Sequence, residues 1–332
     1  MADEASHPAD EQHPADHPAT DHSAHDEHAH DPLDTAHLMD HVQDQTYFEV
    51  PRIFAPHEDT NQAGKLHIYQ PAEKLGIEGV QPRLGIAMID QLIKPLDGRI
   101  TKFMVIEVVA AVLIAAVFIR LGQRVRGGGA PKGKLWNLFE AMLLFIRDQV
   151  ARPAIGHHDA DRFLPFLWTV FFFVLACNLL GMVPWMGSPT GAIAVTGVLA
   201  LITFITVVGA GMFKLGPLGF LKAQVPHMDL PLLLAIPLVP MIFLLEMGGM
   251  IIKHVVLSVR LLANMMAGHL VLAVLIAFIA VAWKSMLIFG VMPASILGAT
   301  ALSMLELFVA FLQAYIFTFL SALFIGMAVH PH

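Results

Sequence analysis

The sequence contains little charge, which narrows the class of protein, and a single cysteine, which excludes an intramolecular disulfide. Only 14% of the 332 residues are charged, whereas 56% are apolar. A soluble domain has about 25% charged residues, so this composition argues against one. The single cysteine, Cys177, cannot form an intramolecular disulfide and says little about the redox compartment. The start of the sequence has no cationic segment followed by an apolar core, so no secretory signal is expected there.

The apolar residues gather into long runs after about residue 103. These runs cover 104–121, 163–185 and 189–213, followed by two longer stretches at 229–283 and 285–329. Crossing a bilayer takes roughly 20 apolar residues as a helix. Backbone polar groups in lipid must be bonded internally, and the alternation typical of barrel strands is absent. The sequence therefore predicts an all-α polytopic membrane protein with about five membrane-crossing helices, the last two long and strongly tilted.

The stretch 229–283 is unusually long for a membrane span. As a helix it would measure about 80 Å, far more than the thickness of a bilayer. No polar loop divides it. It either crosses once at a steep tilt or contains a turn that hydropathy does not reveal. Pro231, Pro237 and Pro240 are placed to bend its start.

Charge divides the chain into unlike regions. Residues 1–45 contain twelve Asp or Glu, nine His and no Lys or Arg, which is typical of a disordered tail. Residues 46–103 contain short mixed runs and are interpreted as an extramembrane segment without an assigned fold. Residues 104–332 form the predicted membrane domain.

The positive-inside rule predicts the orientation of the chain. Residues 120–162 contain eight Lys or Arg and four acids, which places this loop in the cytoplasm and the N-terminus outside. With five spans, the C-terminus is then cytoplasmic. Apolar residues recur at helical spacing over 135–146, which predicts a helix at the cytoplasmic membrane surface. A short helix packed on a partner is the alternative.

Ionisable side chains inside membrane helices are costly and usually functional. Away from their ends, the last two stretches concentrate these residues: Glu246, Lys253, His254, Arg260, His269 and Glu306. On a helix, four polar side chains fall within about 80° of one another and form a stripe about 27 Å long: Glu246, Lys253, Arg260 and Asn264. His269 projects from the face opposite Arg260 and is expected to face the final helix, where Glu306 and Gln313 share a face. Lys253 and His254 could instead extend to a membrane interface.

Several runs in the second half of the chain form recognisable motifs. Residues 258–269 read SVRLLANMMAGH, and Glu246 lies fourteen residues before Arg260. The final stretch contains LEL at 305–307 and LQAY at 312–315, and a weaker motif, CNLLGMVP, lies at 177–184. Together these motifs closely resemble subunit a of F-type ATP synthases, over about residues 100–330.

The resemblance implies a proton-translocating stator subunit beside a rotating c-ring whose subunits each carry a carboxylate at mid-membrane. Arg260 would face those carboxylates and separate two offset half-channels. The remaining family positions are His269 and Glu306 on the outward route, Glu246 on the inward route, and Asn264 and Gln313 beside the arginine. Lys253 is a possible further member. The other partners implied are peripheral-stalk b-type subunits and the lipid bilayer of a bacterial inner membrane. No catalytic residue, cofactor, metal site or nucleic acid is expected.

Two features depart from the family pattern. Gly181 stands where some members carry an acid, and the His-rich tail lies outside the pattern. The tail is interpreted as a solvated acidic segment, with zinc or copper binding as the alternative. A secondary ion or metal transporter is the alternative function. It would need paired His and Asp ligands within spans or inverted repeats, and the sequence offers neither.

Overall fold

The computed structural model describes seven segments of the chain: 45–49, 65–70, 100–126, 133–183, 186–223, 232–283 and 285–330. Nearly all of the predicted tail 1–45 and most of the predicted extramembrane segment 46–103 lie outside the described residues. Within the latter, β1 (Tyr47–Glu49) and β2 (Lys65–His67) form a small antiparallel sheet. The sequence did not indicate this pairing.

Five helices in the described residues are long and apolar enough to cross a membrane. They are α4 (Lys102–Arg126), α7 (Ala160–Gly181), α8 (Ile193–Leu215), α10 (Leu232–Ala282) and α11 (Ile288–Val329). The shorter helical elements are α5 (Lys134–Phe145), the π-helix η2 (Ile146–Ala151), α6 (Arg152–Ile155), the 3-10 turn η3 (Pro189–Gly191) and α9 (Pro217–Ala223). The all-α polytopic fold with five membrane-crossing helices is therefore confirmed.

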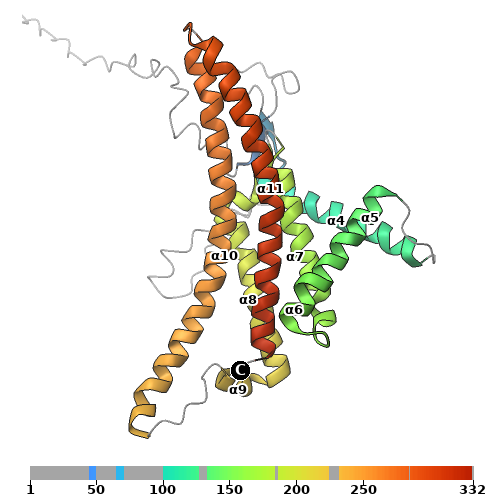
Figure 1. Cartoon of the computed structure of the whole chain (residues 1–332), viewed down its shortest axis with the longest axis vertical. Helices are drawn as coiled ribbons and strands as arrows, with labels where there is room; N and C mark the ends of the chain where they lie inside the picture. The colour runs from blue at the N-terminus through green and yellow to red at the C-terminus, as the bar shows by residue number, and fades with distance from the viewer. Residues whose placement is uncertain are drawn as a thin grey trace, which may run out of the picture.

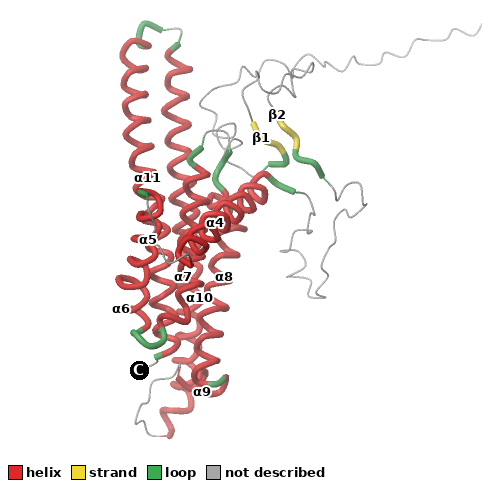
Figure 2. Tube along the Cα trace, turned by 90° about the vertical axis from the view of Figure 1, so that its right-hand side faces the viewer, coloured by secondary structure: helices red, strands yellow, loops and turns green. Residues whose placement is uncertain are grey.

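The described part of the ambiguous stretch, residues 232–283, contains one continuous helix and no internal turn. α10 runs for 51 residues and continues through Pro237 and Pro240. Its length is about 76 Å, against a hydrocarbon core of about 30 Å. Figures 1 and 2 show α10 and α11 side by side as a long hairpin whose tip extends beyond the other helices. A single crossing by α10 requires a strong tilt, and the tilt itself stays a prediction.

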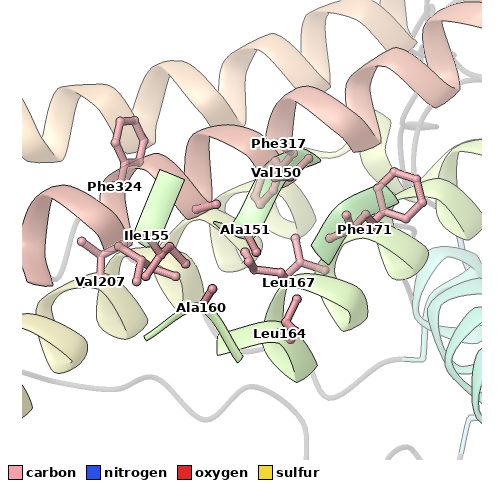
Figure 3. Close-up of a cluster of buried hydrophobic side chains, with 14 of the residues drawn as sticks. Val150, Ala151, Ile155, Ala160, Leu164, Leu167, Phe171, Val207, Phe317 and Phe324 are labelled. Atoms are coloured by element: carbon pink, nitrogen blue, oxygen red, sulfur yellow. The ribbon is translucent and has the colours of Figure 1, made fainter. Parts of the chain in front are cut away.

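The core lies around the C-terminal half of α11, which packs against α6, α7, α8 and α10. Figure 3 shows one cluster of buried side chains from η2, α6, α7, α8 and α11, which includes Val150, Ala151, Ile155, Ala160, Leu164, Leu167, Phe171, Val207, Phe317 and Phe324. In a bilayer, close packing rather than the hydrophobic effect holds helices together, because lipid tails are as apolar as the side chains. The cluster therefore fixes α11, which carries two of the predicted site residues.

Two glycines allow the C-terminal end of α11 to be enclosed. A Cβ at Gly326 would overlap the carbonyl oxygen of Ala154 in α6. A Cβ at Gly211 in α8 would lie 3.1 Å from the carbonyl oxygen of Ala328 in α11 and 2.5 Å from the ring of Phe220 in α9. Small residues at such points let helix backbones approach closely. The backbone of this end of α11 therefore lies close to both α6 and α8.

An ionic cluster ties the same end of the bundle together. Lys214, at the end of α8, donates a hydrogen bond to the carboxylate of Asp159, which precedes α7. His330 Nε2 lies 3.2 Å from the same carboxylate oxygen. The hydrogen bond from Lys214, reinforced by the charge of nearby histidines, holds the pKa of Asp159 below its ordinary value. Three helix ends therefore meet at one carboxylate.

The predicted helix at 135–146 forms, but its apolar face is divided. Phe139 packs against Phe118 of α4 and Phe172 of α7, with ring centroids 6.2 and 6.0 Å apart. Leu135 and Leu138 stay exposed. The helix thus packs partly on its own chain, and its place at a membrane surface stays a prediction.

Candidate functional site

Two contacts define the register between α10 and α11. The side-chain Nε2 of Gln313 donates a hydrogen bond of 3.1 Å to the carbonyl oxygen of Arg260. His269 Nδ1 lies 3.9 Å from Glu306 Oε1. His269 comes after Arg260 in α10, and its partner Glu306 comes before Gln313 in α11. This reversed order is what antiparallel helices require. The register places the predicted site residues of the two helices at matching depths.

Arg260 projects from the exposed face of α10. Its side chain is exposed, as are its neighbours Val256 and Val259. Among the residues that the structure describes, its guanidinium makes no ion pair and no hydrogen bond. Gln313 binds the backbone of this residue and leaves the charged group free. A permanent cation in apolar surroundings needs an anion from elsewhere.

His269 and Glu306 form a largely buried pair between the helices. Their side chains are 18% and 13% exposed. A separation of 3.9 Å is too long for a hydrogen bond, but one water could bridge it. His269 Nε2 is buried and has no hydrogen-bond partner within the described part of the chain. The prediction that His269 faces the final helix is confirmed.

Gly268 makes room for this pair. A Cβ at position 268 would overlap Glu306 Oε1 and would lie 2.9 Å from its Cδ atom. Only glycine allows the carboxyl group to lie against the backbone of α10. The glycine of the motif therefore positions Glu306 next to His269.

The rest of the predicted stripe lies along the same continuous helix. Glu246 and Lys253 are exposed, and Asn264 is half-buried. Within the described segments, neither Glu246 nor Lys253 has an ion pair or hydrogen bond through its side chain. The structure thus brings Arg260 close to Gln313 and His269 close to Glu306. It leaves Glu246 and Lys253 separate from both pairs along α10.

His254 is buried, so the alternative that it extends to an interface is wrong. Its ring lies between Phe204 of α8 and Phe324 of α11, with centroid distances of 5.3 and 4.9 Å. Nδ1 is 2.8 Å from the carbonyl oxygen of Met250 and must donate to it, because a carbonyl only accepts. Nε2 is buried without a partner among the described residues. Lys253, in contrast, is exposed and remains compatible with either interpretation.

A buried polar network, which was not predicted from the sequence, lies beside α11. Asn178 in α7 donates to the carbonyl oxygen of Ala310 at 3.3 Å and accepts a hydrogen bond of 2.8 Å from Thr190. Thr190 and Ser188 hydroxyls are 2.9 Å apart. Asn178 belongs to the CNLLG motif, which was the only signal for it. Ser188 also leaves no room for the acid that some family members carry at position 181. A Cβ at Gly181 would lie 2.6 Å from the hydroxyl oxygen of Ser188.

A second polar contact joins α10 to α8. Ser258 donates a hydrogen bond of 3.1 Å to the hydroxyl of Thr196, and both side chains are buried. This contact lies on the inner face of the same turn that carries Arg260 outward.

In the part of the chain that the structure describes, no group of three or more His, Cys, Asp or Glu side chains could hold a metal ion.

The fold and these side chains define a class: an all-α polytopic membrane protein with charged and titratable groups inside its two longest helices. Residues 104–326 match the family described as ATP synthase A chain. This match covers most of the membrane-crossing helices and every candidate site residue.

Individual relatives agree with the family match. ATP synthase subunit a of Myxococcus xanthus is 43% identical over 240 residues, which are 71% of this chain and 76% of that protein. ATP synthase subunit a of Chloroherpeton thalassium is 42% identical over 236 residues, 70% of this chain and 67% of that protein. ATP synthase subunit a 2 of Chlorobaculum tepidum is 41% identical over 236 residues, 70% and 64% of the two chains. The chain belongs to the ATP synthase A chain family, whose members are multi-pass membrane subunits that act in ATP synthesis and proton transport, and the resemblance inferred from the motifs is confirmed.

Proposed function

We propose that this chain is the stator subunit that passes protons to and from a rotating c-ring, with Arg260 facing the ring carboxylates. The observation that supports this most strongly is the free guanidinium of Arg260 on an exposed apolar face of α10. At about 4 Å and an effective dielectric constant near 20, a carboxylate would gain about 4 kcal/mol from this charge. Such a gain keeps an arriving ring carboxylate ionised and makes it release its proton.

Two offset half-channels complete the proposal. The pair of His269 and Glu306 belongs to the outward-facing route, and the buried, unpartnered Nε2 of His269 supports a water or proton path there. Glu246 belongs to the inward-facing route. Asn264 and Gln313 flank the arginine, and Lys253 is a possible further member.

Arg260 also separates the two routes. Arginine stays protonated in proteins, so protons cannot pass through it from one half-channel to the other. They must instead travel on the ring carboxylates around the rotor. Proton flow is thereby coupled to rotation, and this subunit itself carries out no covalent chemistry.

The proposal includes an assembly and an orientation. The partners are the c-ring, peripheral-stalk b-type subunits and the lipid bilayer of a bacterial inner membrane. The basic segment 120–162 supports a cytoplasmic position for α5, with the N-terminus outside and the C-terminus in the cytoplasm. The division into tail 1–45, extramembrane segment 46–103 and membrane domain 104–332 stays a prediction.

Inverted membrane vesicles that contain the assembled complex test the role of Arg260. Arg260→Ala should abolish ATP-driven proton pumping without loss of assembly, and Arg260→Lys should lose most of it, because a desolvated lysine can release its proton. Passive proton permeability should persist in Arg260→Ala once the nucleotide-hydrolysing sector is stripped off, because the barrier between the routes is gone. Arg162→Gln, at an exposed arginine of α7, is the matched control and should pump normally. Normal pumping by Arg260→Ala contradicts the proposal.

A further inference from the structure

The basic residues near the α4–α7 connection fall into two groups. Arg147 and Arg152 both bind the carboxylate of Asp148, at 2.9 and 2.7 Å. Lys214 binds Asp159 at the other side of the same region. Each of these three cations has an ion-pair partner within the chain. The remaining basic side chains must find their counter-charge elsewhere.

Three cations without an ion pair lie on the last turns of α4 and the first turn of α5. Arg120, Arg124 and Lys134 are exposed, and within the described segments none of them makes an ion pair. Arg120 and Arg124 lie one turn apart on α4. The guanidinium of Arg124 lies 4.6 Å from the ring centroid of Trp136, which holds the start of α5 against the end of α4. We call Arg120, Arg124, Lys134 and Trp136 the α4–α5 basic cluster.

Exposed apolar side chains flank this cluster on both helices. Ile119 on α4 is 59% exposed, and Leu135 and Leu138 on α5 are 69% and 53% exposed. α4 is one of the helices able to cross a membrane, so its end lies at the boundary of the bilayer. Cations beside apolar side chains and an indole ring at that depth suit a lipid, which has a charged headgroup above apolar chains. A soluble acidic protein would match the charges but not the apolar flanks.

We propose that the α4–α5 basic cluster binds the headgroup of an anionic phospholipid, whose acyl chains lie along the exposed apolar side chains of α4 and α5. The two guanidinium groups bind phosphate oxygens through paired N–H donors. The indole N–H of Trp136 has no acceptor within the described residues and is available as a further donor. Basic residues near an anionic surface strengthen binding by about fivefold each.

Quenching of Trp136 fluorescence tests the proposal on the full-length chain in a zwitterionic detergent. Phosphatidylglycerol with brominated acyl chains is added, and phosphatidylcholine with the same chains serves as the neutral probe. The signal of Trp136 is the difference between the unmodified chain and Trp136→Phe, which keeps an aromatic ring for Arg124. Phosphatidylglycerol should quench at a much lower mole fraction than phosphatidylcholine, and added salt should weaken this preference.

Two variants make the test specific. Replacing both arginines, Arg120→Gln with Arg124→Gln, should shift the phosphatidylglycerol midpoint about 25-fold upward, at fivefold for each arginine. Arg162→Gln, at an exposed arginine outside the cluster, should leave the midpoint unchanged. Both side chains of the double variant are exposed, so folding should persist, and circular dichroism verifies it.

Four results would overturn the proposal. The first is equal quenching by the anionic and the neutral lipid, and the second is an unchanged preference in the folded double variant. The third is displacement of phosphatidylglycerol by millimolar inorganic phosphate at constant ionic strength, which would indicate a site for free anions. The fourth is loss of Trp136 quenching in the assembled complex, which would indicate that a protein subunit covers the cluster.

Discussion

A methyl group at position 268 is the sharpest probe of the His269–Glu306 pair. The Cβ of Gly268→Ala would overlap Glu306 Oε1 and would lie 2.9 Å from its Cδ and 3.1 Å from its Cγ. Real Cβ atoms essentially never approach a heavy atom within 3.0 Å. The variant must therefore push the carboxyl group away or separate α10 from α11.

The expected cost falls on proton transfer more than on stability. Alanine is favoured over glycine inside a helix by about 1 kcal/mol, whereas overpacking costs about 1–3 kcal/mol. The two terms leave a net destabilisation of about 0–2 kcal/mol. His269 and Glu306 are already 3.9 Å apart, and proton transfer needs direct contact or one bridging water. A displacement of about 1 Å should therefore slow pumping by roughly 10- to 100-fold.

The measurement is the initial rate of ATP-driven proton pumping in inverted vesicles with equal amounts of complex. Gly248→Ala lies on the same helix, where an added Cβ meets nothing within 4 Å, and is the matched control. It should pump at the unmodified rate. Combining Gly268→Ala with Glu306→Asp shortens the displaced side chain and should recover part of the lost rate.

Two outcomes would refute this reasoning. One is an unmodified pumping rate in Gly268→Ala, which would mean that the position of the Glu306 carboxyl does not matter. The other is equal loss in Gly248→Ala, which would trace the defect to the flexibility of α10 rather than to the overlap.

Two further substitutions test the enclosed end of α11. Gly326→Ala forces a Cβ onto the backbone oxygen of Ala154, which cannot rotate away, so the Tm of the detergent-solubilised chain should fall by the equivalent of about 1–3 kcal/mol. Gly290→Ala, with nothing within 4 Å, should not lower it. Asp159→Asn should also lower the Tm, because it removes the hydrogen-bonded ion pair with Lys214. The pKa of Asp159 is lowered in the folded chain, so this loss should be constant above the ordinary pKa of about 4 and should vanish as pH falls through the lowered pKa. A loss that grows on acidification would contradict the assignment.

Hydropathy predicted the five spans because each is long enough to cross the hydrocarbon core of a bilayer and contains few charged residues. It could not predict that α10 is one helix, since the two prolines at its start do not interrupt it. It also missed η2 and α6, whose residues Val150 and Ile155 are buried against α7 and α11. In a membrane protein a side chain that faces lipid and one that faces another helix are both apolar. The apolar pattern of 135–146 therefore indicated a helix but not what covers it.

The site was more predictable than its surroundings because the regular geometry of a helix gives the direction in which each side chain projects. Arg260 and His269 project from opposite faces of the helix, which was enough to predict that the histidine faces the final helix. The short distance between His269 and Glu306 agrees with this prediction. Ser188 and Thr190 lie outside the long helices, where no periodicity gives their direction, so their bonds to Asn178 could not be predicted.

At the level of Arg260, the inner face of α10 is hydrogen-bonded to other helices, whereas the outer face carries an unpaired charge. This contrast supports a moving counter-charge. The inner face is fixed by the hydrogen bond of Ser258 to Thr196 and by Gln313, which binds the backbone of Arg260. The outer face carries a guanidinium that nothing in the described part of the chain neutralises. Glu246 lies about 21 Å away along the helix, and Glu306 faces His269. A rigid backbone beneath a free, flexible cation is the arrangement expected if the anion it meets arrives, pauses and leaves, as successive carboxylates of a turning ring would.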